Sequence, residues 1–397
     1  MPLALYLLAL AVFAMGTSEF MLAGLVPDIA ADLDVSVGTA GLLTSAFAVG
    51  MVLGAPAMAT FARRWPARAT LLGCLALFAA CHVVAATTPS FAVLFGTRVV
   101  AAVANAGFLA VALSTATRLV APDQKGRALA VLLSGTTLAT VAGVPAGALL
   151  GAALGWRATF WAVALLCVPA AFGIARGVRS RTRGTPDGPG PSLVSELAQL
   201  RAPRLLVAML LGALVNGGTF AAFTFLAPIV TGTAGLDEVW VSLALVLFGA
   251  GSFVGVAAAG RLSDRYPRLT IGVASPALLL GWLSLALLAD HAVPLLVLVF
   301  VQGALAFAVG SSLIARVLYA ASDAPTMGGS YATVALNVGA VVGPAIGAAA
   351  LSGHGDLGPV WVAAALTGVA LLAMVPSLGR VTGFADTTGR SCRPTYR

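Results

Sequence analysis

Long apolar runs alternate with short polar segments along the whole chain. Each run has about 20 residues or more, the length that an α-helix needs to cross the ~30 Å hydrocarbon core of a membrane. Backbone polar groups in that core need internal partners, so we expect each run to be a helix. The pattern predicts twelve spans, over residues 3–27, 38–61, 69–88, 91–117, 129–154, 158–176, 205–230, 239–260, 270–289, 293–319, 327–352 and 360–379.

Composition and charge agree with an integral membrane protein. Hydrophobic residues make up 60% of the chain and charged residues 9%, against roughly 25% charged in soluble domains. If the N-terminus is inside, the outer loops hold seven acids and one base, Arg157, whereas the inner loops and tail hold twenty of the 22 Lys and Arg residues. This asymmetry predicts a multi-pass protein of the cell inner membrane with both termini in the cytoplasm. It also explains the net charge of +8 without a nucleic-acid partner.

One polar segment, rich in Pro and Gly, divides the spans into six plus six. The two halves match at an offset near 200 residues: RRWPAR at 63–68 resembles DRYPRL at 264–269, and GVPAG at 143–147 resembles GPAIG at 343–347. Such an offset indicates a parallel repeat about the membrane normal. We expect an N-terminal six-helix bundle over 1–178, a cytoplasmic linker over 179–204, a C-terminal six-helix bundle over 205–380 and a cytoplasmic tail over 381–397.

The segment GRLSDRYPR, at 260–268 between the eighth and ninth spans, resembles the G-x-L-x-D-R-x-x-R signature of the major facilitator superfamily. The resemblance covers nearly the whole chain and implies an all-α membrane fold of twelve helices in two six-helix repeats. An acid and several bases at a helix corner can pair differently in two conformations, so we expect a latch here rather than charges that only set topology. The first-half copy departs from the signature, with Arg63 where the second half has Asp264. The expected latch residues are Gly260, Asp264, Arg265 and Arg268.

Two further segments resemble the drug:proton antiporter branch of this superfamily that has twelve spans. GTTLATVAGVPAGALLG, at 135–151, is similar to the antiporter motif at Gly143, Pro145 and Gly147, although small residues also serve ordinary helix packing. GTSEFMLAGLVPDIAADLDVS, at 16–36, is similar to the start of that branch and closely resembles the chloramphenicol-resistance exporters of actinobacteria. The resemblance implies proton-coupled efflux of a small neutral drug, chloramphenicol above all, by alternating access that confers antibiotic resistance.

Only two charged residues lie well inside the expected spans, Glu19 in the first and Arg98 in the fourth. Counted from the outer ends at 1.5 Å per residue, they lie ~12 Å and ~10 Å deep, so they share a depth. Charged residues inside a membrane are costly and functional by default, and the resemblance implies that both spans line the central cavity. We expect Glu19, held between burial and a nearby cation, to load and release protons. The alternative is a permanent ion pair that only positions helices.

A pocket for a neutral drug combines apolar walls with a few polar groups. The residues in the spans that could supply these are Thr17, Phe20, Asn105, Asn216, Thr219, Phe220, Gln302 and Asn337. We interpret His82 as an interfacial or packed histidine rather than a proton relay.

Other functions fit the chain less well. An exporter of sugars or other small metabolites would favour paired acids or amides in the cavity, and few are present. A non-transporting membrane sensor normally needs a soluble output domain, but the longest loop has about 26 residues, too few for a folded domain. No metal-ligand spacing, nucleophile cluster or Walker A loop is found, so we expect no enzyme activity, no metal and no cofactor. The expected partners are the drug, protons and lipid, with the chain monomeric.

Overall fold

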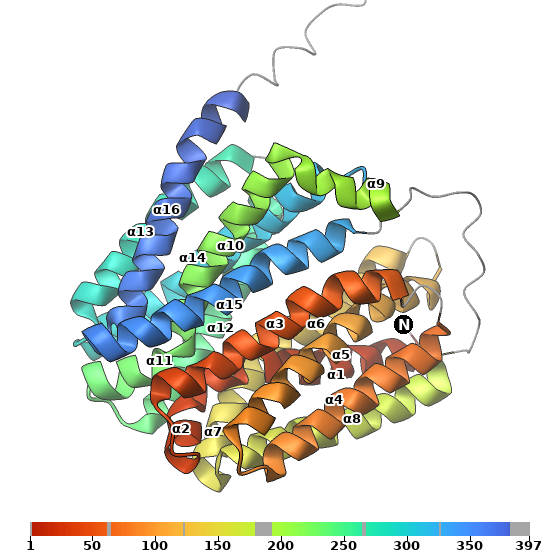
Figure 1. Ribbon diagram of the computed structural model, residues 1–397, viewed down its shortest axis with the longest axis horizontal. Helices are drawn as coiled ribbons and strands as arrows, with labels where there is room; N and C mark the ends of the chain where they lie inside the picture. The colour runs from red at the N-terminus through yellow and green to blue at the C-terminus, as the bar shows by residue number, and fades with distance from the viewer. Residues whose placement is uncertain are drawn as a thin grey trace, which may run out of the picture.

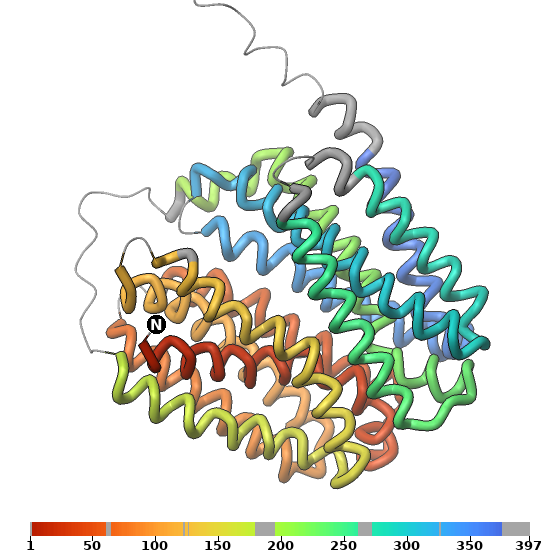
Figure 2. The backbone as a smooth tube through the Cα atoms, turned by 180° about the vertical axis from the view of Figure 1, so that it is seen from behind, coloured from red at the N-terminus to blue at the C-terminus, as the bar shows by residue number. Residues whose placement is uncertain are grey.

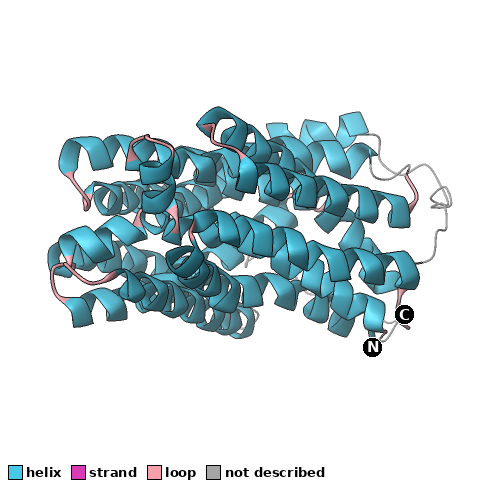
Figure 3. Cartoon of the chain, turned by 90° about the horizontal axis from the view of Figure 1, so that it is seen from below, coloured by secondary structure: helices cyan, strands magenta, loops and turns pink. Residues whose placement is uncertain are grey.

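The computed structural model describes residues 2–61, 65–121, 124–178, 193–263, 267–324 and 327–381. Within these residues the secondary structure is helical, and the helices run side by side with the loops gathered at two ends (Figure 3). Among the described residues, ten helices are long and apolar enough to cross a membrane, and two further apolar stretches, Gly272–Leu288 and Gly358–Met374, are shorter. The prediction of an all-helical protein with many membrane spans is confirmed.

The first half of the chain forms one bundle, coloured red to yellow-green in Figure 1. Its first and fifth spans are not continuous α-helices: a 3-10 turn, η1, interrupts the first, and a π-helical turn, η4, interrupts the fifth. The elements are α1 (Leu3–Phe20), η1 (Met21–Gly24), α2 (Val26–Asp32), α3 (Val37–Phe61), α4 (Ala67–Thr87), α5 (Phe91–Arg118), α6 (Lys125–Leu138), η4 (Ala139–Gly143), α7 (Val144–Leu154) and α8 (Trp156–Gly177).

The second half, green to blue, repeats this arrangement after a short helix, α9. Its first long helix, α10, is also followed by a broken segment. The elements are α9 (Leu193–Ala198), η5 (Gln199–Arg201), α10 (Pro203–Thr224), α11 (Leu226–Pro228), η6 (Ile229–Thr233), α12 (Glu238–Ser263), α13 (Pro267–Leu288), α14 (Ala292–Ala320), α15 (Gly328–His354) and α16 (Gly358–Val381).

We call the end of the bundle at Leu3 and Gly177 the proximal end, and the end at Gly24 and Gly155 the distal end. Helix α9, interpreted from the sequence as a surface helix, lies at the proximal end against the second half. The Glu196 side chain is buried and accepts a hydrogen bond from the Met327 backbone N–H at 2.8 Å. Helix α9 is therefore docked at the start of α15.

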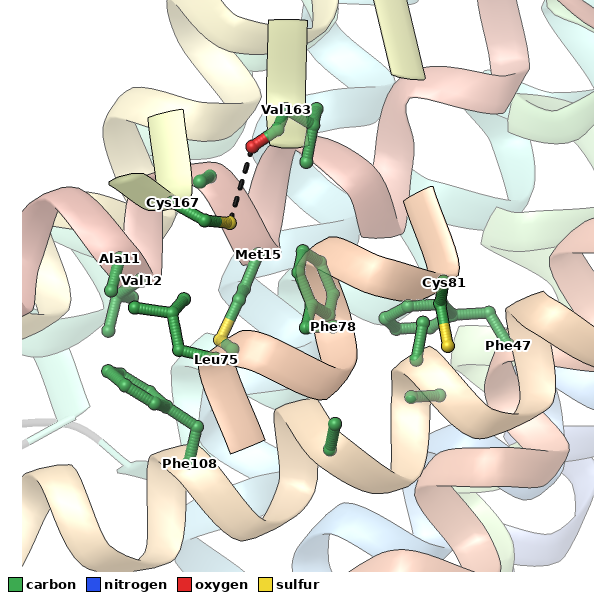
Figure 4. Packing of buried hydrophobic residues seen from close by; sticks show 14 of the residues in the cluster. Ala11, Val12, Met15, Phe47, Leu75, Phe78, Cys81, Phe108, Val163 and Cys167 are labelled. Carbon is green, nitrogen blue, oxygen red and sulfur yellow. Dashed lines mark hydrogen bonds between the residues drawn. The ribbon is translucent and has the colours of Figure 1, made fainter. Parts of the chain in front are cut away.

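The first half has its own apolar core (Figure 4). Phe78 and Leu75 of α4 pack with Met15 of α1 and Phe108 of α5, all buried. The Cys167 thiol lies among them and donates to the Val163 carbonyl at 3.3 Å, as a small packed group. This core fixes α1, α4, α5 and α8 as one unit, and these helices carry the charged site described below.

The two halves meet along two seams. Helices α3 and α15 lie side by side (Figure 1), and polar bonds join them at mid-depth and at the proximal end: Ser45 donates to the Val341 carbonyl at 2.8 Å, and Ser330 donates to the Ala55 carbonyl at 3.2 Å. At the second seam, α12 packs on η4 and α7 in the middle and distal part of the bundle. Figure 2 shows the two bundles from behind. The η1 turn also packs on α10, α11 and α12, so the halves are joined firmly at the distal end.

Several residues predicted from the sequence lie outside the described part of the chain. These are Asp264 and Arg265 of the expected latch, most of the linker (179–192) and the tail from residue 382. Arg268 is described only by its place in α13. Gly260, near the end of α12, is exposed and has open space where a Cβ would be.

Candidate functional site

Glu19 lies where the first span breaks. Helix α1 ends at Phe20, and the chain continues through the η1 turn before α2 begins. Glycine is needed at the end of this turn, because a Cβ on Gly24 would lie 2.7 Å from the Cβ of Ala148. The Glu19 side chain is partly exposed, whereas Ser18 is fully buried. The break therefore leaves a carboxylate beside a buried polar group, in the distal part of the span.

Arg98 projects from α5 onto the end of α1. Its guanidinium is 1% exposed and donates two hydrogen bonds to Ser18, from Nη1 to the side-chain Oγ at 2.7 Å and from Nη2 to the backbone carbonyl at 2.9 Å. The Phe47 ring covers it at 4.5 Å, a cation–π contact. The last carbonyls of a helix lack intrahelical partners and form the negative end of its dipole. The end of α1 is therefore a favourable place for a buried cation.

His82 of α4 completes this polar cluster. Its Nε2 is 2.7 Å from Ser18 Oγ, and its Nδ1 is 2.8 Å from the Phe78 carbonyl oxygen. The ring is 2% exposed and stacks near Phe78 and Phe160. Packing of His82 was expected from the sequence, but its contact with the Arg98 partner was not. A signal for it existed, since His82 is five residues from the distal end of α4, ~8 Å deep, close to the depth of Arg98.

Arg98 reaches the residue next to Glu19, but the two charged side chains do not form a salt bridge. In the described part of the chain the salt bridges are Arg157–Asp32 and Asp290–His291, the second at 2.6 Å, and both lie at the distal end. The arginine is instead held by the residue that precedes the glutamate. The structure therefore does not contain the alternative arrangement, a direct ion pair between Glu19 and Arg98.

An aromatic cluster begins directly after Glu19 and crosses to the second half. The Phe20 ring centroid is 5.8 Å from that of Phe220 and 6.3 Å from that of Phe223. The contacts continue from Phe223 to Phe248 at 4.7 Å and from Phe248 to Phe307 at 6.1 Å. Two of the predicted drug-binding residues, Phe20 and Phe220, are therefore brought together beside the carboxylate.

The other residues predicted to bind the drug lie elsewhere or have their polar groups engaged. Asn216 donates across the helix interface to the Leu336 carbonyl at 2.8 Å, and Thr219 and Asn337 bond within their own helices. Buried Asn105 donates to the Met51 sulfur at 3.6 Å. Thr17 packs against η4, near Gly143. Asn216 and Asn105 thus join neighbouring helices, whereas the polar groups of Thr219 and Asn337 are engaged within their own helices.

Gln302 faces a small cavity inside the second half rather than the junction. The cavity has a volume of about 10 Å³ and is lined by apolar and aromatic side chains together with Trp282. Gln302 also donates to the Leu278 carbonyl at 3.2 Å. A space of this size holds at most one water molecule, so Gln302 is not in contact with a drug in this conformation.

The small residues of the fifth span let it approach α1 and α8 closely. A Cβ on Gly147 would lie 3.1 Å from the Thr159 side chain, and one on Gly143 would overlap Thr17. Pro145 follows the π-helical turn, as is common where a helix bends. The motif thus packs the fifth span tightly against the helix that carries Glu19.

A larger cavity of about 550 Å³ opens at the distal junction of the halves. Its walls include Asp28, Thr231, Asp237 and Glu238. Burial, together with the neighbouring Glu238, raises the pKa of Asp28 above its ordinary value of 3.8. Like charges from the two halves therefore face each other where the distal end is closed.

Two bundles of apolar helices meet at a junction that holds a partly exposed carboxylate and an aromatic cluster, with a buried arginine inside the first bundle. This arrangement is that of a membrane transport protein. A sequence profile of the Major Facilitator Superfamily matches residues 8–334, and the chain belongs to this superfamily.

Relatives agree with this assignment. The chain is 66% identical over 378 residues to a "Chloramphenicol resistance protein" of Streptomyces lividans, a match that covers 95% of this chain and 96% of the relative. It is 33% identical to the "Inner membrane transport protein YdhP" of Escherichia coli, over 87% and 88% of the two chains. A bacterial homologue of the human lysosomal transporter Spinster, solved in an inward-facing and unoccupied conformation, has a TM-score of 0.68 at 19% identity, over 96% of this chain and 93% of that one.

Proposed function

We propose that this protein exports chloramphenicol, a small neutral drug, in exchange for protons, and so confers resistance. The observation that carries the proposal is the 66% identity, over almost the whole chain, to the Streptomyces lividans protein. The proposal includes twelve spans in two six-helix repeats, of which ten are evident by length and two are shorter apolar helices. The proton gradient is the energy source, with no other cofactor.

The cluster of Phe20, Phe220 and Phe223 is the proposed contact surface for the drug. Aromatic rings bury large areas and stack on other rings, and Phe20 comes from the first half whereas the other two come from the second. A ligand between these rings touches both halves. That is the requirement for a substrate whose binding is linked to movement of one half against the other.

Glu19 is the proposed proton carrier. It is the one acid inside the spans near this cluster, and its side chain is partly exposed at the junction while Arg98 is enclosed within the first half. Such a carboxylate lies beside a fixed cation and is partly open to water. It can bind or release a proton according to which side of the membrane its water is connected to. Binding of a proton and export of the drug are then linked, because alternating access exposes the same carboxylate to each side in turn.

The proximal end is the proposed cytoplasmic face. In the topology predicted from the sequence, the inner loops and tail hold twenty of the 22 Lys and Arg residues, the pattern of the positive-inside rule. Of the described bases, Arg118, Lys125 and Arg204 lie at proximal helix ends. The η1 turn and the packing of α12 on α7 join the two halves toward the distal end, the proposed outer face. A cysteine at Leu197, 47% exposed on α9, tests the orientation in a background without the native cysteines. It should react with an impermeant thiol reagent only after the cells are permeabilised.

Drug-susceptibility testing in a host that lacks its own pumps tests the function. Cells that express the chain should tolerate more chloramphenicol than cells with an empty vector. Cells that express Glu19→Gln, at equal membrane levels, should be as sensitive as the empty-vector cells. In proteoliposomes an imposed pH gradient should drive chloramphenicol movement by the wild type only. Gradient-driven movement by Glu19→Gln at the wild-type rate would show that another group carries the proton.

A further inference from the structure

A single serine holds both the buried arginine and the buried histidine. Ser18 Oγ is 2.7 Å from Arg98 Nη1 and 2.7 Å from His82 Nε2. A guanidinium only donates hydrogen bonds, so Ser18 Oγ accepts from Arg98. Its own hydroxyl hydrogen is then available for His82 Nε2, the second polar atom within reach.

The other side of the histidine ring fixes its tautomer. The Phe78 carbonyl can only accept, so the bond at 2.8 Å requires a proton on His82 Nδ1. With Nδ1 protonated and Nε2 accepting from Ser18, the ring is neutral. Donors and acceptors thus run in one direction, from Arg98 to the Ser18 hydroxyl, to His82 and to the Phe78 carbonyl.

This chain of bonds determines where the Arg98 charge lies. Besides Arg98 itself on α5, the titratable groups near this charge are Glu19 on α1 and His82 on α4, while α3 and α8 contribute the rings of Phe47 and Phe160. An arginine free to move would pair with the nearby Glu19 carboxylate, since two parallel bonds between a guanidinium and a carboxylate are strong. Glu19 would then be neutralised by the arginine and would need no proton.

We infer that Ser18 and His82 are positioning residues that hold the Arg98 guanidinium on the end of α1 and off the Glu19 carboxylate, so that a proton rather than the arginine neutralises Glu19. The inference rests on the proposed role of Glu19 as proton carrier. Ser18 supplies both acceptors, its hydroxyl and its carbonyl. His82 keeps the Ser18 hydroxyl turned so that its lone pairs face Arg98.

The pH dependence of drug transport in proteoliposomes tests this role. Ser18→Ala removes one of the two acceptors that hold Arg98, and His82→Phe removes the bond that orients the Ser18 hydroxyl. Both variants should weaken the hold on Arg98 and favour its approach to Glu19, so half-maximal transport should need roughly ten times more protons, about one pH unit lower. His82→Gln restores an acceptor near the Nε2 position and should return the midpoint toward that of the wild type. Cys81→Ala is the matched control: Cys81 is one residue earlier on the same helix, is buried and lies outside the chain of bonds, so the midpoint should be unchanged.

A spectroscopic measurement checks the contacts without transport. The chain has three histidines, of which His291 and His354 are exposed, so nitrogen-15 histidine labelling gives one buried signal. In the wild type this signal should show a proton on Nδ1 and none on Nε2, and its Nε2 shift should change in Ser18→Ala. The opposite tautomer, or a doubly protonated ring, would overturn the inference.

The outcomes separate the two proposals. If Glu19→Gln is inactive while His82→Phe and Ser18→Ala keep the wild-type midpoint, or lose rate equally at every pH, the proton role of Glu19 stands and the positioning role is wrong. If Glu19→Gln still responds to the gradient, the proposed function fails and the positioning role fails with it. An acid shift in both variants, rescued in His82→Gln, supports the inference.

Discussion

Gly249 lies in α12 at the seam where the second half meets the first. A Cβ built on it would lie 2.9 Å from the Val141 Cα and closer still to the Thr140 carbonyl oxygen, both of them backbone atoms of η4. Backbone atoms cannot turn aside as a flexible side chain can. Gly249→Ala is therefore incompatible with the present seam unless α12 and η4 move apart.

The size of the effect follows from this geometry. Ordinary contacts of a Cβ begin at 3.4 Å, so the seam must open by at least about 0.5 Å at Val141. Extra atoms forced into a packed contact typically cost about 1–3 kcal/mol. Only the conformation with this seam closed bears the cost, so the equilibrium should move toward the distally open conformation by a factor of about 5 to 150.

Spin-label distance measurements across the distal end can detect this change. Leu154 at the end of α7 and Val239 at the start of α12 are 72% and 66% exposed, so labels there should not disturb packing. In a background without the native cysteines, Gly249→Ala should enlarge the population with the longer distance between labels. The proton gradient and drug should be absent, so that only the substitution acts.

Two other glycines are the controls. Gly251 lies two residues further along α12, but a Cβ there would meet α14 of the same half, with Ala304 N at 3.0 Å; Gly368 has open space. Gly251→Ala should lower thermal stability without favouring the open state, and Gly368→Ala should change neither. An unchanged distance distribution in a folded Gly249→Ala, or an equal shift in Gly251→Ala, would refute the reasoning.

Further predictions concern the drug, the distal cavity and the latch. Phe220→Ala should weaken chloramphenicol binding by roughly ten-fold, because it removes a ring pair worth about 0.5–1.5 kcal/mol beyond its buried area, whereas Phe220→Tyr should bind nearly as the wild type does in equilibrium dialysis. Asp28 has a raised pKa, so its protonated form is favoured in this folded arrangement and thermal stability should fall as pH rises above about 4. Asp28→Asn should flatten that fall, and melting curves that stay as steep as those of the wild type would contradict the assignment. Asp264→Asn should slow transport at normal membrane expression; an unchanged rate would reduce GRLSDRYPR to a topology signal.

The spans and the two inward charges could be predicted from the sequence because the membrane imposes a simple rule on each. Twenty apolar residues must be helical in hydrocarbon, and an acid or base among them is conspicuous. Glu19 and Arg98 were found in this way, and their common depth followed from the rise of a helix. The break after Phe20 was not foreseen, since the apolar run continues without interruption to residue 27 and nothing in its hydropathy marks a turn.

Contacts between helices were predicted less well. Asn216, Thr219 and Asn337 are polar residues in apolar spans, and such residues suit a drug pocket and an interhelical bond equally. Whether such a residue faces a pocket or a neighbouring helix depends on the rotation of its helix about the helix axis. A span with apolar residues on all sides does not reveal that rotation. In the sequence, His82 is a lone histidine near the end of a span. Its contacts come from Ser18 and Arg98 on two other helices, which the sequence does not place beside it.

The two halves hold different side chains at similar places. The first half holds the charged groups around Ser18, whereas the corresponding region of the second half holds the neutral Gln302 and Trp282 beside a small cavity of about 10 Å³. The aromatic cluster is mostly in the second half, and Phe20 is its contact from the first. Phe20 is bonded directly to Glu19 at the last turn of α1. Under the proposed function, a drug that displaces Phe20 would move the same helix end that carries the carboxylate and holds Arg98, so one turn of α1 would link drug binding to protonation.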